Sequence, residues 1–247
     1  MRSHLLLFLA LIVFVSPLLA KKNVDVVFCI DTTDGMKGEI KALKKKVKAI
    51  AVAVDEADVQ MGVVAYRDEG DEYRTKELAL TSNAKEVRTF VKKLKAAGGG
   101  DSEDVRAALH KAIKDMKWRK GGRLVVLIGD AGPNKERKDN PSCSRLANKA
   151  KEKGIKILAL ACAEMNLDGI ASWKRMAQIS DGTYEQLPAA KGRRLIVPED
   201  CGSNCDNCTI PCDAADGSHG GAAKKVKETA SKALERAVTD QIRALIR

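Results

Sequence analysis

The chain has 247 residues, of which 45% are hydrophobic and 31% charged, as in an ordinary globular domain. Its formal net charge is +11, but only 4% of its residues are aromatic, and the lysines are spread over segments with helical spacing. Basic side chains interleaved with aromatic ones, which single-stranded nucleic acid prefers, are missing, so we expect no specific nucleic-acid binding.

The first twenty residues have the pattern of a signal peptide. Arg2 supplies a positive charge, and Leu5 to Val15 is an apolar run too short to span a bilayer comfortably. Leu18 and Ala20 fit a cleavage site. An uncleaved anchor is the alternative. We expect cleavage, which gives a secreted or periplasmic protein with no transmembrane span in the mature chain.

Strand-like and helix-like segments alternate up to residue 187. Strand-like runs, several of them largely apolar, predict strands at 24–30, 59–65, 77–80, 124–128, 155–161 and 183–187. Helical spacing of apolar residues predicts helices at 35–54, 83–95, 103–116, 141–153 and 170–179. This alternation is typical of an α/β fold with a doubly wound, mainly parallel six-stranded sheet and helices on both faces.

The alternation breaks at residues 188–222, which are rich in Gly, Asp, Asn and Cys and show no periodicity. Residues 223–246 are again amphipathic and predict a last helix. The interrupting segment has too few apolar residues to form a core of its own. We therefore interpret residues 21–247 as one domain whose last helix is delayed by an insertion.

Three acidic, turn-forming loops are expected at one edge of this sheet. They are Asp31-Thr32-Thr33-Asp34-Gly35, Gly98–Asp104 and Gly129–Pro133. Ligands of such sheets bind at the carboxyl ends of the strands, where these loops lie. Aspartates gathered there repel one another unless a cation joins them, and a hard divalent ion prefers carboxylate and hydroxyl oxygens.

Each loop also has a simpler interpretation. Asp, Thr and Gly form turns and helix caps without any metal, and Asp101 or Ser102 could cap the helix predicted at 103–116. For a single loop we would favour that interpretation. Three such loops in this order and position favour a metal site.

The motifs Asp31-x-Thr33, Gly98–Asp101 and Ile128-Gly129-Asp130 resemble the von Willebrand factor A domain and its metal-ion-dependent adhesion site (MIDAS). The runs GVVAYRDEGD, FVKKLKAAGGGDSEDVRAAL, KWRKGGRLVVLIGDAGPN and GIASWKRMAQISDGTYEQL are similar to the subgroup found in bacterial and alpha-kinase-linked proteins. The resemblance implies the Rossmann-like fold of that family, with one short antiparallel edge strand.

The resemblance also implies a bound divalent cation, with Mg²⁺ expected first and Ca²⁺ or Mn²⁺ as alternatives. The implied ligands are Asp31, Thr33, Asp101 and Asp130. Water would complete the coordination shell, and one position would stay open for a carboxylate of a partner.

Two departures from the family pattern affect this site. The first loop of the family reads D-x-S-x-S, and Gly35 stands where the last serine is expected, so a hydroxyl ligand is lost unless Asp34 or water replaces it. In the second loop, Gly100-Asp101 stand where a threonine is usual. The added negative charge should hold the cation more tightly and weaken its pull on a partner's carboxylate.

Together these features predict an exported binding module that engages a protein or glycan ligand through its metal, and no enzyme. One alternative is a structural or interaction module with a degenerate metal site. Another is a haloacid-dehalogenase-like phosphatase, which also places an Asp after its first strand. The phosphatase is disfavoured because Thr33 stands where its second carboxylate is needed and Asn134 replaces a later acid.

The chain contains seven cysteines. Cys201, Cys205, Cys208 and Cys212 are spaced either for two local disulfides or for a four-thiolate zinc site. Export favours the disulfides. Cys29, inside the first predicted strand, is expected to be a buried free thiol.

Overall fold

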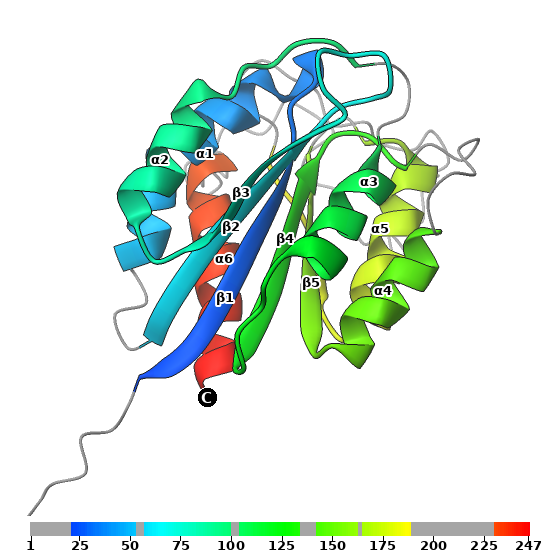
Figure 1. The fold of residues 1–247 in the computed structure, drawn as a ribbon. Coiled ribbons are helices and arrows are strands. Elements are labelled where there is room, and N and C mark those ends of the chain that lie inside the picture. Colours follow the sequence, from blue (N-terminus) through cyan, green and yellow to red (C-terminus); the bar gives the residue numbers. More distant parts are fainter. Residues whose placement is uncertain (1–20, 53–56, 100–103, 134–141, 163–164, 189–229) are drawn as a thin grey trace, which may run out of the picture.

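A six-stranded sheet runs through the middle of the molecule, in the order β3-β2-β1-β4-β5-β6 (Figure 1). Its strands are β1 (Lys22–Asp31), β2 (Ala57–Tyr66), β3 (Thr75–Thr81), β4 (Gly122–Gly129), β5 (Ile155–Ala161) and β6 (Thr183–Gln186). Neighbouring strands pair in parallel, except that the edge strand β3 is antiparallel to β2. The doubly wound, mainly parallel sheet with one antiparallel edge strand is thereby confirmed.

This computed structural model describes residues 21–52, 57–99, 104–133, 142–162, 165–188 and 230–247. The predicted signal peptide, Asp101, and the four clustered cysteines Cys201, Cys205, Cys208 and Cys212 lie outside the described residues. Nearly all of the predicted insertion at 188–222 does too. Among the helices that the structure describes, none has the length and apolar character needed to cross a membrane.

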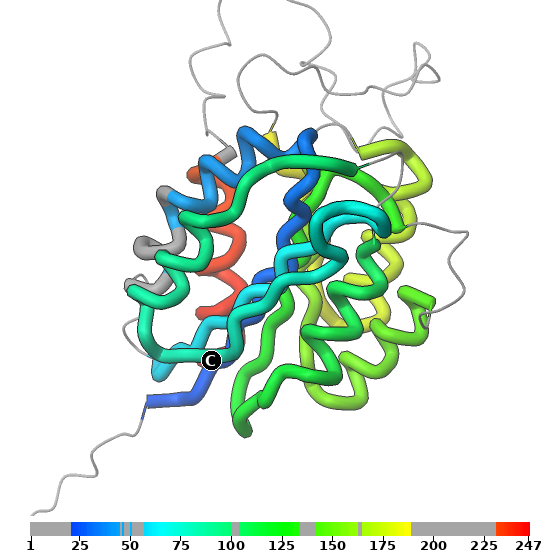
Figure 2. The backbone as a smooth tube through the Cα atoms, turned by 45° about the horizontal axis from the view of Figure 1, so that its top comes forward, coloured from blue at the N-terminus to red at the C-terminus, as the bar shows by residue number. Residues whose placement is uncertain are grey.

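Helices cover both faces of the sheet (Figures 1 and 2). On one face lie α1 (Lys37–Val52), α2 (Ala84–Lys93) and α6 (Ala230–Ile246). On the other lie α3 (Val105–His110), which continues into the π-helical segment η2 (Lys111–Asp115), α4 (Cys143–Glu152) and α5 (Leu167–Ile179). A short 3₁₀ turn, η1 (Asp34–Met36), leads from β1 into α1.

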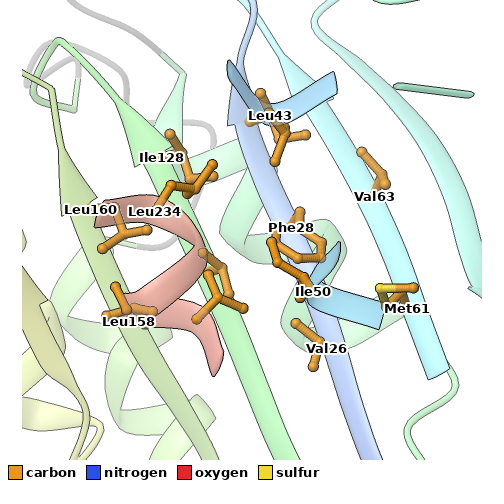
Figure 3. Close-up of a cluster of buried hydrophobic side chains, with 14 of the residues drawn as sticks. Val26, Phe28, Leu43, Ile50, Met61, Val63, Ile128, Leu158, Leu160 and Leu234 are labelled. Atoms are coloured by element: carbon orange, nitrogen blue, oxygen red, sulfur yellow. The ribbon is translucent and has the colours of Figure 1, made fainter. Parts of the chain in front are cut away.

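The central strand β1 divides the core into two apolar layers. Val26, Phe28 and Ile30 face the layer under α1 and α6, whereas Val27 and Cys29 face the layer under the opposite helices. This alternation follows from the two-residue period of a strand, and both faces are apolar because both are covered. Figure 3 shows the first layer. Cys29 is a buried free thiol, as predicted.

The C-terminal helix α6 completes the first layer. Ala233, Leu234, Ala237, Val238 and Ile242 are buried in the same cluster as the residues of β1 and α1. Figure 3 shows Leu234 beside β4 and β5. The helix that follows residues 189–229 therefore packs directly on the sheet, which is the position expected for the last helix of an α/β domain.

Side-chain caps set two helix starts that differ from the sequence prediction. Asp104 Oδ1 accepts a hydrogen bond of 3.1 Å from the Ala107 amide, so the helix predicted at 103–116 begins at Val105 with Asp104 as its N-cap. Asn166 Oδ1 accepts a 2.8 Å bond from the Gly169 amide. The helix predicted at 170–179 consequently begins at Leu167.

We expect Phe28→Ala to lower the free energy of unfolding by about 3–5 kcal/mol, because it leaves a cavity between the sheet and α1. Phe28 is 1% exposed. Urea unfolding monitored by circular dichroism measures the change. Leu167→Ala is the matched control because Leu167 is 58% exposed, and it should cost less than about 0.5 kcal/mol. Equal costs for the two variants would contradict this packing.

Candidate metal centre

The candidate site lies where the strand order reverses. From β1 the sheet grows to β2 and β3 on one side and to β4, β5 and β6 on the other. Ile30 of β1 pairs with Ile128 of β4 in parallel register, so Asp31 and Gly129-Asp130 leave the sheet side by side. Such a reversal point, at the carboxyl ends of the strands, is the usual ligand position in open α/β sheets.

The carboxylate of Asp31 is fully buried at the start of the first loop. Its Oδ1 atom accepts hydrogen bonds from the Thr33 amide, at 2.9 Å, and from the Thr33 hydroxyl, at 2.7 Å. Its Oδ2 atom is buried and has no hydrogen-bond partner within the described part of the chain. A buried carboxylate oxygen without a partner is costly, and a bound cation would satisfy it.

Asp130 lies close enough to Asp31 to affect its ionisation. Burial, and then the charge of Asp130, raise the pKa of Asp31 from 3.8 to about 7, against the opposing effect of hydrogen bonds from the Thr33 amide and hydroxyl and from the Asp130 backbone. Without a cation the site therefore tends to take up a proton. A divalent ion would offset the same repulsion while both carboxylates stay charged.

The side chain of Asp130 reaches the first loop at Gly35. A Cβ atom added to Gly35 would lie 2.0 Å from Asp130 Oδ2. Asp34, considered above as a replacement for the missing serine hydroxyl, is exposed to solvent. The structure thus places the carboxylate of Asp130, rather than that of Asp34, against the position of the missing serine.

Arg67, which belongs to none of the sequence motifs, holds the first loop in place. Its guanidinium is almost fully buried. It donates from Nε to the Thr32 carbonyl at 3.2 Å and from Nη2 to the Lys95 carbonyl at 2.8 Å. Its Cζ atom lies 4.3 Å from the centre of the Tyr73 ring. The Tyr73 hydroxyl in turn hydrogen-bonds Thr32 Oγ1 at 2.8 Å. One signal was available: Arg67 directly follows a buried strand.

The β2–β3 loop, residues 67–74, also contacts the start of the second acidic loop. Asp71 Oδ2 accepts a 3.0 Å hydrogen bond from the Gly99 amide. The first loop bonds the same segment, since the Asp34 amide donates to the Gly98 carbonyl at 3.1 Å. The described start of the second loop, up to Gly99, therefore lies against the first loop. The place of Asp101 in the site stays a prediction.

The donors present fit a hard divalent cation. The pair Asp31 and Asp130 supplies carboxylate oxygens, and Thr33, 3% exposed, supplies a hydroxyl. In the described ranges, no group of three or more His, Cys, Asp or Glu side chains is placed to hold a metal. Oxygen donors without nitrogen or sulfur suit Mg²⁺, Ca²⁺ or Mn²⁺ rather than softer ions.

A family model described as von Willebrand factor type A domain matches residues 25–189. The fold is similar to proximal thread matrix protein 1 from the mussel byssus, with a TM-score of 0.54 and 16% identity over 67% of this chain and 42% of that one. It is also similar to BatB from Bacteroides thetaiotaomicron, with a TM-score of 0.55 and 13% identity over 89% of this chain and 99% of that one.

A third similar structure is the pilus adhesin SpaC from Lactobacillus rhamnosus GG, with a TM-score of 0.52 and 15% identity over 68% of this chain and 29% of that one. One structure of the mussel protein has a zinc-occupied MIDAS motif. At these identities the likeness shows the fold alone, and the chain spans less than half of the mussel protein and of the adhesin. No curated protein sequence matched the chain significantly.

The raised pKa of Asp31 predicts a distinctive pH dependence of stability for the metal-free protein. Between its ordinary pKa of 3.8 and its folded value of about 7, the folded chain binds the proton and the unfolded chain does not. The free energy of unfolding in EDTA should therefore fall as pH rises through this range, by at least about 1 kcal/mol.

Asp31→Asn is the matched variant, since it keeps the size of the side chain and removes the charge. In EDTA it should show a flatter profile than wild type and be the more stable of the two at pH 8. Urea unfolding at a series of pH values measures both. Parallel profiles for the two proteins would show that the folded state does not raise the pKa of Asp31.

Proposed function

The chain belongs to the von Willebrand factor type A family, and on that premise we propose that it binds a partner through a divalent metal ion at the carboxyl ends of β1 and β4. Domains of this family are generally interaction modules rather than enzymes. The ion would be held by Asp31, Thr33 and Asp130 and, from the sequence motif, Asp101. It would supply a positive centre that a partner's oxygen can approach.

One observation carries the proposal: the buried Asp31 Oδ2 atom has no hydrogen-bond partner among the described residues and lies under the influence of the Asp130 charge. A cation would bind Asp31 Oδ2 and would at the same time neutralise the repulsion between Asp31 and Asp130. We propose Mg²⁺ as the ion, with Ca²⁺ or Mn²⁺ as alternatives, because the donors are oxygens. The zinc in the mussel protein makes Zn²⁺ a further ion to test.

The partner we propose is a protein or a glycan with an exposed carboxylate, which would take the open position on the ion. The signal-peptide pattern of residues 1–20 supports an encounter outside the cytoplasm. Residues 201–212, with their four cysteines, fit local disulfides in such an oxidising compartment. The likeness to a pilus adhesin agrees with an extracellular binding role.

We propose binding rather than catalysis also because of what Thr33 does. Its hydroxyl and amide both donate to Asp31 Oδ1, which orients that carboxylate and occupies one of its oxygens. A phosphatase would need a carboxylic acid in the place of Thr33 to protonate its leaving group. The same contacts suit a metal ligand whose second oxygen points to the ion.

Isothermal titration of the full chain with Mg²⁺ and Mn²⁺ tests the metal site. Wild type should bind one ion, and Asp130→Ala should lower the affinity at least about tenfold because it removes one of the two carboxylates. Asp115→Ala is the matched control, since Asp115 is an exposed carboxylate at the end of η2. Absence of binding by wild type would instead favour a structural module with a degenerate site.

Capture of partners tests the interaction itself. Immobilised wild-type protein should retain a component of the producing cell's envelope or medium in Mg²⁺ and release it in EDTA. Asp130→Ala should retain little of it under either condition, while Asp115→Ala should behave as wild type. If EDTA and Asp130→Ala both leave retention unchanged, the contact surface lies elsewhere on the domain.

A further inference from the structure

Gly35 stands where a serine ligand is expected, and the structure gives a reason other than loss of the site. A Cβ atom at this position would lie 2.0 Å from Asp130 Oδ2 and 3.0 Å from Asp130 Cγ. Contacts under 3.0 Å are essentially never made by real Cβ atoms. No side chain larger than hydrogen therefore fits at residue 35 while Asp130 keeps its conformation.

The backbone does not explain the glycine. Positive φ angles among the described glycines are confined to Gly70, Gly98, Gly99, Gly121 and Gly154. Gly35 is not among them, so its conformation is open to any residue. A side chain at residue 35 is therefore excluded by the carboxylate of Asp130 and not by the backbone conformation.

The position of a Cβ atom at residue 35 lies near Asp31 Oδ2, the buried oxygen that accepts no hydrogen bond that meets the geometric criteria within the described part of the chain. Gly129, the last residue of β4, directly precedes Asp130, and a Cβ atom on Gly129 would lie 3.1 Å from Asp31 Oδ2. Asp130 thus starts next to Asp31 and extends its carboxylate toward residue 35. An oxygen of Asp130 occupies the region from which a serine at residue 35 would otherwise approach the ion.

We propose that Asp130 coordinates the ion directly, in the place of the missing serine hydroxyl, and that Gly35 is the residue whose bare backbone makes room for it. This inference rests on the proposed metal-binding function. It assigns Gly35 a positioning role. The neutral serine hydroxyl of the family motif is then replaced by the charged carboxylate of Asp130, so no ligand is lost.

Titration calorimetry with Mn²⁺ on the full chain tests the exchange. Gly35→Ala removes no donor atom, yet it should lower the affinity at least about tenfold, because the methyl group displaces Asp130. Gly35→Ser should also bind more weakly than wild type, although it adds the hydroxyl of the family motif. Circular dichroism and thermal unfolding in EDTA establish that each variant is folded.

The double variant Gly35→Ser with Asp130→Ala separates the two roles. With the carboxylate gone, the serine has room, so the double variant should bind Mn²⁺ at least as tightly as Asp130→Ala alone. It also removes the clash, so it should fold even if Gly35→Ser does not. Such non-additivity is the signature of two residues acting at one place.

The outcomes distinguish this inference from the proposed function. Wild type that binds no Mn²⁺ would overturn both. Wild type that binds, together with a Gly35→Ser variant that binds as tightly or more tightly, would overturn only the inference and identify Gly35 as a lost ligand. Gly35→Ala with unchanged affinity would likewise remove Asp130 from the inner shell.

Discussion

The repulsion between two aspartates at neighbouring strand ends is the constraint on which this site depends. The parallel register of β1 and β4 places Asp31 and Asp130 together, and the covered sheet buries Asp31 completely. Asp31 is shielded from water there, and the Thr33 amide and hydroxyl both donate to the same oxygen, Oδ1, so these bonds leave Oδ2 unserved. The fold therefore creates an electrostatic need that either a proton or a metal ion can meet.

The charge that remains on the bound ion would affect how the proposed partner binds. A divalent ion neutralised by two carboxylates retains little charge with which to attract a third one. Contact of the partner with the surrounding surface would then contribute more of the affinity. The exposed Asp34 and Glu69 lie in loops of the site, and they would favour basic groups beside the carboxylate of the proposed partner.

Much of the fold could be predicted from the sequence because both faces of the sheet are covered. Apolar runs such as Val24–Ile30 need little context to be recognised as buried parallel strands. Helix starts were predicted less accurately. The caps are Asp104 and Asn166, and several neighbouring residues could have capped the same helices by their residue type. Asp31 and Asp130 could be brought together from topology alone. The contact of Gly35 with Asp130 could not, because spacing says nothing about side-chain volume.

The buried guanidinium of Arg67 has a consequence for the kinetics of ion uptake. It fastens the Thr32 carbonyl to the Lys95 carbonyl, and Tyr73 covers it. The entropy of ordering the first loop is thus lost when the chain folds and not when the ion arrives. If Mg²⁺ is the ion, as proposed, it would meet a first loop whose backbone is already ordered, so loss of its own tightly held hydration water would set the pace of its binding to that loop.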